Sequence, residues 1–152
     1  MTNKWGLVVL AGMLEVLAPV DLSYAAGSLL VTPQEAAMPP AKYAREKKIM
    51  RSVFPGPRIT VKSPVSLKDV SPPVKIDVAF EPTSIPIDRD SLKILYVKFV
   101  DIDITDRVRP YITPAGIRIP DADLPSGKHT IEIDLRDLDG NVTSSEMTFT
   151  VK

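Results

Sequence analysis

The stretch SGKHTIEIDLRDLDGNVTSSEMTFTV, from Ser126 to Val151, decides the fold class because its side chains alternate between apolar and polar. Ile131, Ile133 and Leu135 are separated by single polar residues, which is the period of a β-strand with one buried face. The turn residues Asp-Gly-Asn follow at 139–141, and EMTFTVK then resumes the alternation. The sequence therefore predicts a β-hairpin at this end of the chain.

The same period of two begins near residue 58 and continues up to this hairpin. In PPVKIDVAF, every second residue from Val74 to Phe80 is apolar, which predicts a strand that lines a core. SLKILYVKFVDIDIT is apolar on both faces from Leu92 to Val100, as in a central strand covered twice, and then alternates over residues 101–104. RITVKSPV, RPYIT and GIRIP predict further short strands.

About seven short strands with regularly spaced turns predict an all-β fold, an antiparallel β-sandwich of immunoglobulin size. A small barrel is the structural alternative. Fifteen prolines against seven glycines favour edges, turns and extended connectors over long helices. We expect three regions: residues 1–25 as a signal peptide, 26–57 as a helical, basic extension or linker, and 58–152 as the sandwich.

One set of residues in the closing hairpin follows a recognisable order: Leu124, Gly127, His129, Thr130, Ile131, Ile133, Leu135, Asp137, Gly140, Asn141, Phe149 and Val151. This order resembles the last two strands of bacterial immunoglobulin-like domains. The upstream IDRDSLKILY is similar to the part of such domains where an acidic loop leads into a strand. The resemblance covers about Ile59 to Lys152 and implies an immunoglobulin-like sandwich in a secreted or cell-surface protein, used as a spacer, adhesion unit or accessory module.

The first residues have the pattern of a secretory signal peptide. Lys4 precedes an apolar run from Trp5 to Leu14, and small residues then lead to an A-x-A-like site with expected cleavage after Ala25. The expected location is therefore periplasmic or secreted, with no stable membrane span after cleavage. Glu15 and Asp21 are untypical of such a segment and leave an uncleaved anchor as the alternative.

The region that follows predicts two helices. Thr32, Pro33 and Glu35 match a capped helix start, which two prolines soon interrupt, and a second helix is expected from Ala41 to about Val53. On this basic segment, apolar residues and flanking lysines suggest a surface that binds a protein partner. Its candidate partner-binding residues are Tyr43, Lys47, Met50 and Phe54. The alternative is a solvated helix or linker whose apolar residues rest on its own domain.

His129 is the single histidine, and its position in the alternation predicts an inward or rim orientation at the start of a strand. A general base needs a nucleophile or an orienting carboxylate in reach, and nothing near His129 provides one. We therefore expect His129 to bond to backbone, and the protein not to be an enzyme. The absence of cysteine excludes disulfides, thiolate nucleophiles and thiolate zinc sites.

Asp137, Asp139 and Asn141 form a cluster of oxygen ligands that could bind calcium. The alternative is that they form an ordinary Asp-Gly hairpin turn. We expect no other cofactor. The formal net charge of zero gives no general attraction to nucleic acid.

Together these observations predict an exported, non-catalytic binding or structural module of the cell envelope that acts by protein–protein recognition. The alternative is an accessory carbohydrate-binding or calcium-dependent module that partners an enzyme. In that case, sugar stacking would depend on Tyr96, Tyr111 or Tyr43.

Overall fold

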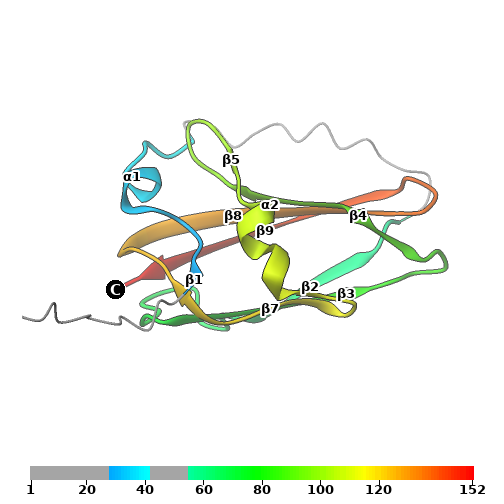
Figure 1. Ribbon diagram of the computed structural model, residues 1–152, viewed down its shortest axis with the longest axis horizontal. Helices are drawn as coiled ribbons and strands as arrows, with labels where there is room; N and C mark the ends of the chain where they lie inside the picture. Colours follow the sequence, from blue (N-terminus) through cyan, green and yellow to red (C-terminus); the bar gives the residue numbers. More distant parts are fainter. Residues whose placement is uncertain (1–27, 42–54) are drawn as a thin grey trace, which may run out of the picture.

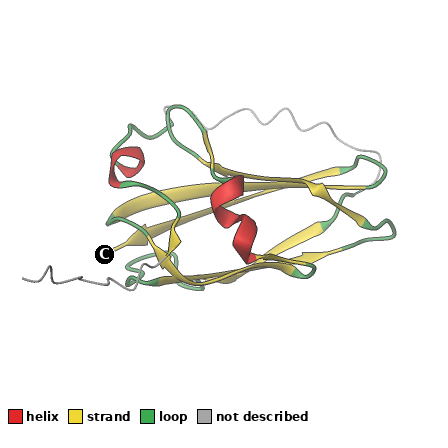
Figure 2. Cartoon of the chain, viewed as in Figure 1, coloured by secondary structure: helices red, strands yellow, loops and turns green. Residues whose placement is uncertain are grey.

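The computed structural model describes residues 28–41 and 55–152 (Figure 1). The described residues form two β-sheets packed face to face, with two short helices and one 3-10 turn (Figure 2). The predicted all-β sandwich is thereby confirmed. The predicted signal peptide, most of the second helix and its partner-binding residues Tyr43, Lys47, Met50 and Phe54 lie outside the described residues.

The first sheet has the strand order β1-β7-β3-β2, with β6 also paired to β7, and the second has the order β5-β4-β8-β9. In chain order, the elements are β1 (Ser28–Leu29), α1 (Pro33–Ala36), β2 (Arg58–Ser63), β3 (Val74–Glu81), β4 (Ile87–Tyr96), β5 (Ile102–Asp103), α2 (Thr105–Val108), η1 (Arg109–Tyr111), β6 (Ile112–Thr113), β7 (Gly116–Asp123), β8 (Gly127–Asp137) and β9 (Val142–Val151). All strand pairs within the sheets are antiparallel except β1 with β7.

The core lies between the sheets and follows the predicted alternation. On β3 the buried residues include Val74, Ile76 and Val78, and on β8 they include Ile131 and Ile133. The predicted closing hairpin is β8 and β9, in continuous register from Gly127↔Val151 to Arg136↔Val142. Burial of each such aliphatic side chain contributes about 1.5–3 kcal/mol, so this interface is the main source of stability.

The predicted central strand from Leu92 to Val100 is wrong in its second half. Strand β4 ends at Tyr96, and the chain then turns away, so Phe99 and Val100 are exposed. The turn is needed because β5 returns antiparallel to pair with the last two residues of β4. An apolar sequence on both faces therefore marks an exposed loop here and not a strand covered twice.

Of the alternating strand predicted over residues 101–104, only the two residues of β5 are in a strand. The N–H of Thr105 donates to Asp103 Oδ1 at 3.0 Å, and α2 begins there with Ile104 buried as its N-cap. Most of the predicted strand RPYIT is also helical, because Arg109–Tyr111 forms a 3-10 turn and strand β6 follows. Figure 2 shows this helical connection crossing from one sheet to the other.

The fold includes part of the region 26–57, which the sequence predicts to be an extension or linker. Leu30 and Val31 are 1% and 0% exposed and belong to the hydrophobic core, and β1 pairs with the end of β7. The predicted helix start is confirmed, since Thr32 and Glu35 form a capping box at the start of α1. The segment 28–41 is therefore part of the sandwich.

Candidate functional site

One end of the sandwich gathers most of the irregular chain. We call it the α1 end. It contains the segment 28–41, the β2–β3 connector (64–73), the β4–β5 loop (97–101), the β7–β8 loop (124–126) and the chain end at Lys152 (Figure 1). The opposite end contains the β8–β9 turn (138–141).

Two cations hold α1 against the sandwich. Arg107 donates to both carboxylate oxygens of Glu35 at 2.7 Å and to the carbonyl of Leu30 at 2.9 Å. The hydrogen bonds from Arg107 lower the pKa of Glu35 from 4.5 to about 2. Lys98 Nζ donates to the carbonyl of Ala36 at 2.8 Å. The fixed position of α1 therefore depends on side chains that are distant in the sequence.

His129 lies beneath this end and is 1% exposed. Its Nε2 is 2.7 Å from the carbonyl of Pro125, and its Nδ1 is 3.0 Å from the hydroxyl of Tyr96. The carbonyl of Pro125 can only accept, so Nε2 carries a proton and donates to it; in the neutral ring Nδ1 then accepts from the hydroxyl of Tyr96. The predicted backbone bond is confirmed. Because both nitrogens are engaged, the ring has no free position for proton transfer to a substrate.

Burial lowers the pKa of His129, and the nearby charge of Lys98 acts in the same direction, while the bond to Pro125 opposes both. Lys98 is itself 7% exposed, with Nζ 5.1 Å from the centre of the Tyr96 ring, and burial lowers its pKa. Burial, followed by the charge of Glu35, raises the pKa of Tyr96 to about 12. The polar side chains of this cluster therefore lie in the interior, where they contact one another and backbone carbonyls.

Tyr96 is one of the three tyrosines predicted as alternatives for sugar stacking, and the structure contradicts that role. Its side chain is 0% exposed, so no ligand reaches its face. Tyr111 is half-buried and its hydroxyl bonds to Ser28, while Tyr43 lies outside the described residues. The partnership of Tyr96 with His129 was not predicted, although a tyrosine in an apolar run needs a partner for its hydroxyl when it is buried.

The candidate calcium residues lie at the β8–β9 turn, where Asp137 is 1% exposed. Its Oδ1 accepts from the backbone N–H groups of Asp139 and Asn141, and its Oδ2 accepts from the Asn141 amide at 2.8 Å. Burial opposes ionisation, but the bonds from Asn141 and the turn backbone outweigh it and lower the pKa of Asp137. Within the described ranges, no group of three His, Cys, Asp or Glu residues is arranged to hold a metal. Calcium binding therefore stays a prediction. The hydrogen bonds within the β8–β9 turn give Asp137 and Asn141 a structural role.

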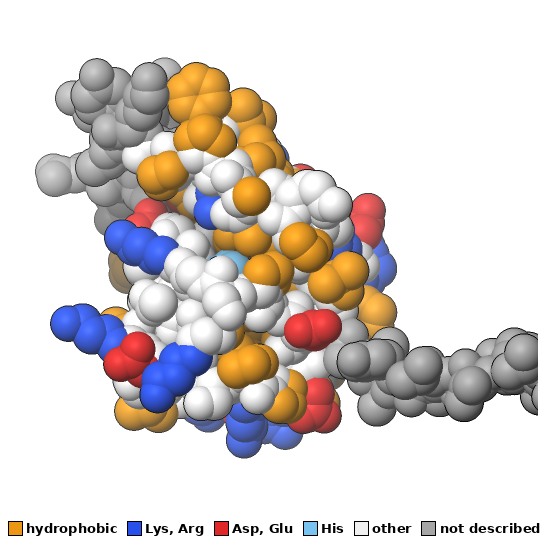
Figure 3. All heavy atoms as spheres, turned by 90° about the vertical axis from the view of Figure 1, so that its left-hand side faces the viewer, with side chains coloured by type: hydrophobic (Ala, Val, Ile, Leu, Met, Phe, Trp, Pro, Cys, Tyr) orange, Lys and Arg blue, Asp and Glu red, His pale blue; other side chains and the backbone are white. Residues whose placement is uncertain are grey.

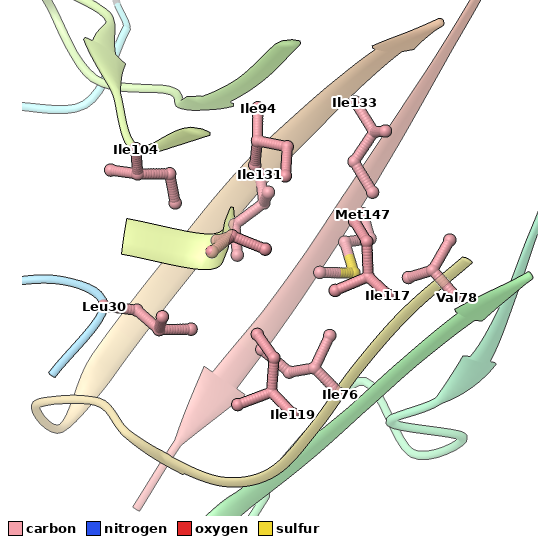
Figure 4. Close-up of a pocket in the computed structure, with 11 residues that line it drawn as sticks. Leu30, Ile76, Val78, Ile94, Ile104, Ile117, Ile119, Ile131, Ile133 and Met147 are labelled. Atoms are coloured by element: carbon pink, nitrogen blue, oxygen red, sulfur yellow. The ribbon is translucent and has the colours of Figure 1, made fainter. Parts of the chain in front are cut away.

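A small cavity of about 20 Å³ lies between the two sheets. Figure 4 shows Ile94, Ile131 and Met147 pointing into it from one sheet, Ile117 and Val78 from the other. Its whole lining is aliphatic or Met, so it offers no polar group to orient a ligand. We interpret it as a packing gap in the core, which an apolar lining keeps dry.

Exposed apolar side chains concentrate at the α1 end. Among the described residues, the exposed large hydrophobic side chains are Leu29 (53%), Val65 (89%), Leu67 (53%), Phe99 (58%), Val100 (57%) and Leu138 (66%). All but Leu138 belong to β1, the β2–β3 connector or the β4–β5 loop. Figure 3 views this end and shows hydrophobic side chains spread across it, with the largest group at the top.

A second open feature is the outer edge of β9. The N–H of Thr150 donates to Leu67 and its carbonyl accepts from Val70, so the backbone groups of Thr150 point away from β8. Alternation gives Ser144, Glu146 and Thr148 the same outward direction. No strand of the described segments pairs with β9 at these three positions.

Comparisons of the chain with protein-family models, with curated proteins and with solved structures find no match. Of the helices in residues 28–41 and 55–152, none has the length and apolar character needed to cross a membrane.

Proposed function

We propose that the protein is an exported, non-catalytic, immunoglobulin-like module of the cell envelope that acts by protein–protein recognition. The strands from β2 to β9 can be lettered A, B, C, C′, D, E, F and G in chain order. The first sheet then has the order DEBA, with β1 as an additional strand beside E, and the second has the order C′CFG. This is the arrangement of strands in immunoglobulin-type sandwiches, and it supports the assignment suggested by the closing hairpin.

The non-catalytic role is supported by the surroundings of His129. Its two ring nitrogens are bonded to Tyr96 and Pro125, and the ring is covered. A substrate would have to enter the core to reach it. Lys98, a buried cation among the described residues, donates to the backbone carbonyl of Ala36.

The recognition mechanism that the geometry supports best is strand addition at the outer edge of β9. The observation that carries it is the row of outward backbone groups at Ser144, Glu146 and Thr148, without a partner strand in the described part of the chain. An extended peptide can pair with such a row through main-chain hydrogen bonds. The exposed side chain of Glu146, at the centre of the row, also discourages edge-to-edge pairing between copies of the protein.

The test removes one outward backbone N–H of β9 and keeps the strand itself. Glu146→Pro removes the outward N–H, and proline is tolerated where the N–H of an edge strand faces solvent. Glu146→Gln is the matched control, because it changes the side chain and keeps the N–H. Each full-length variant is tagged and used to capture proteins from the envelope fraction of its own cells. We expect the proteins captured by the unsubstituted chain to be kept by the glutamine variant and lost by the proline variant.

A second pair of substitutions tests the alternative surface on the basic extension. Deletion of residues 26–57 is unsuitable, because it removes the core residues Leu30 and Val31. Lys47→Glu combined with Met50→Ser alters that segment and leaves Leu30 and Val31 unchanged. Loss of the same captured protein in this variant, with retention in Glu146→Pro, would move the recognition surface away from β9.

A further inference from the structure

The α1 end carries five large apolar side chains in water, on three separate parts of the chain. Val65 and Leu67 lie on the β2–β3 connector, Phe99 and Val100 on the β4–β5 loop, and Leu29 on β1. At the opposite end, Leu138 alone among the described residues is comparable. Exposed apolar groups that gather on one surface mark a contact with a protein or a membrane.

The path of the chain indicates which contact this is. Ser28, the first described residue, belongs to the α1 end and precedes the exposed Leu29. The apolar run from Trp5 to Leu14 ends fourteen residues before Ser28. Even a fully extended chain covers only about 3.3–3.6 Å per residue, so Ser28 lies within about 50 Å of that run. If this run stays uncleaved and lipid-bound, it attaches the domain to the bilayer through Ser28, so the α1 end is the end nearest the point of attachment.

Charged residues beside the apolar ones fit a lipid surface. Lys68, Lys128 and Lys152 are exposed at this end, where their ammonium groups could reach phosphate headgroups. Asp69 and Asp123 are exposed there too and reduce the net attraction. We therefore expect the apolar side chains to supply most of the binding, and anionic lipid to strengthen it only modestly.

We propose that the α1 end is a lipid-docking surface, on which the β2–β3 connector and the β4–β5 loop enter the headgroup region of a bilayer. The fixed α1 segment supports this geometry, because the N–H of Phe99 donates to the carbonyl of Pro39 at 2.9 Å and Lys98 holds Ala36. The loop is thus presented by a rigid base. Docking in this way leaves the β9 edge and the β8–β9 turn accessible to a protein partner.

The absence of cysteine from the chain makes single-site labelling possible. Val65→Cys and Val100→Cys in the full chain carry an environment-sensitive fluorophore at the proposed surface, and Leu138→Cys carries it at the opposite end. The probe membranes are vesicles of phosphatidylglycerol and phosphatidylcholine in about equal parts. We expect a blue shift and brighter emission at positions 65 and 100 when vesicles are added, and no change at 138. Equal changes at all three positions would overturn the proposal.

The apolar N-terminal run can bind lipid by itself, so vesicle binding alone is not the readout. If the protein floats with vesicles but the labels at 65 and 100 do not respond, the run alone binds lipid and the proposal fails. A response at 65 and 100 without vesicles that grows with protein concentration would assign the surface to a second copy instead. Phe99→Ser combined with Val100→Ser should lower the vesicle-induced response of the label at position 65 several-fold, whereas Leu138→Ser should not. Circular dichroism of each variant checks that the sandwich is intact, and an unchanged response at position 65 in a folded Phe99/Val100 variant would also contradict the proposal.

Discussion

The hydroxyl of Tyr96 lies 3.0 Å from Nδ1 of His129, and the two side chains, 0% and 1% exposed, join the neighbouring strands β4 and β8 inside the core. Phe149 packs against the histidine ring with 5.8 Å between ring centres. Together with the bond to Pro125, this contact satisfies the histidine completely. The pair is therefore a structural unit whose energy can be measured.

Tyr96→Phe should destabilise the protein by about 1–3 kcal/mol, because it leaves a buried nitrogen of His129 without a partner. His129→Phe should destabilise it as well, since the hydroxyl of Tyr96 and the carbonyl of Pro125 lose their partner. The double variant should cost less than the sum of the two, because neither polar group of the pair is then left behind. Urea unfolding of the four proteins measures this coupling. Strict additivity would show that the hydrogen bond is not maintained in solution.

Acid should weaken the fold through His129. Burial lowers the pKa of His129 in the folded protein below its usual value of 6.5, so at lower pH the unfolded chain binds the proton more readily. Stability from this group is fully present above pH 6.5 and is lost as pH falls from 6.5 towards the folded pKa. Because His129 is the single histidine of the chain, His129→Phe should make the free energy of unfolding depend less on pH below 6.5. An equal slope in the variant would assign the effect to other groups.

Sequence periodicity was sufficient to predict the faces of the long strands. Ile131 and Ile133 alternate with polar residues, and successive side chains of a strand point to opposite faces. Their burial and the inward orientation of His129 could therefore be predicted. The tyrosine partner of His129 could not be predicted in the same way. It lies 33 residues away, and the contact exists only because β4 and β8 are neighbours in the folded sheet.

The predictions from sequence were wrong where apolar residues do not recur at a regular spacing. Phe99 and Val100 continue an apolar run, and hydropathy cannot distinguish an exposed loop from a strand covered twice. Leu30 and Val31 enter the core from a two-residue strand, which is too short to show any period. The carbonyl of Leu30 is held by Arg107, which lies 77 residues later in the sequence.

The ion pair between Glu35 and Arg107 should contribute to stability much more than a neighbouring exposed pair. Arg107→Met removes a bidentate bond and the donor to Leu30, which should cost about 1–2 kcal/mol after allowance for screening by solvent. Arg109→Met is the matched control, because its partner Asp106 is 89% exposed and such pairs contribute close to nothing.

The same pair should give a pH dependence at acid pH. Since the folded pKa of Glu35 is about 2 against a usual 4.5, its contribution is present above pH 4.5 and is lost as pH falls from 4.5 towards 2. Chemical unfolding of the Arg107 and Arg109 variants across this range checks the prediction. A pH dependence that survives in Arg107→Met would show that the contribution does not come from this pair.

Adjacent residues test whether the segment before residue 42 belongs to the fold. Leu30→Ala should cost about 2–5 kcal/mol, because Leu30 is 1% exposed and lines the gap between the sheets, where truncation enlarges a cavity. Leu29→Ala, at a side chain that is 53% exposed, should change stability by about 0.5 kcal/mol or less. Thermal unfolding followed by circular dichroism measures both variants. Equal, small changes in stability for the two variants would mean that the segment detaches in solution. Arg107 would then also have to lose its bond to Leu30 and its bidentate contact with Glu35. A large effect at Leu30 alone would show that the sandwich core starts immediately after β1.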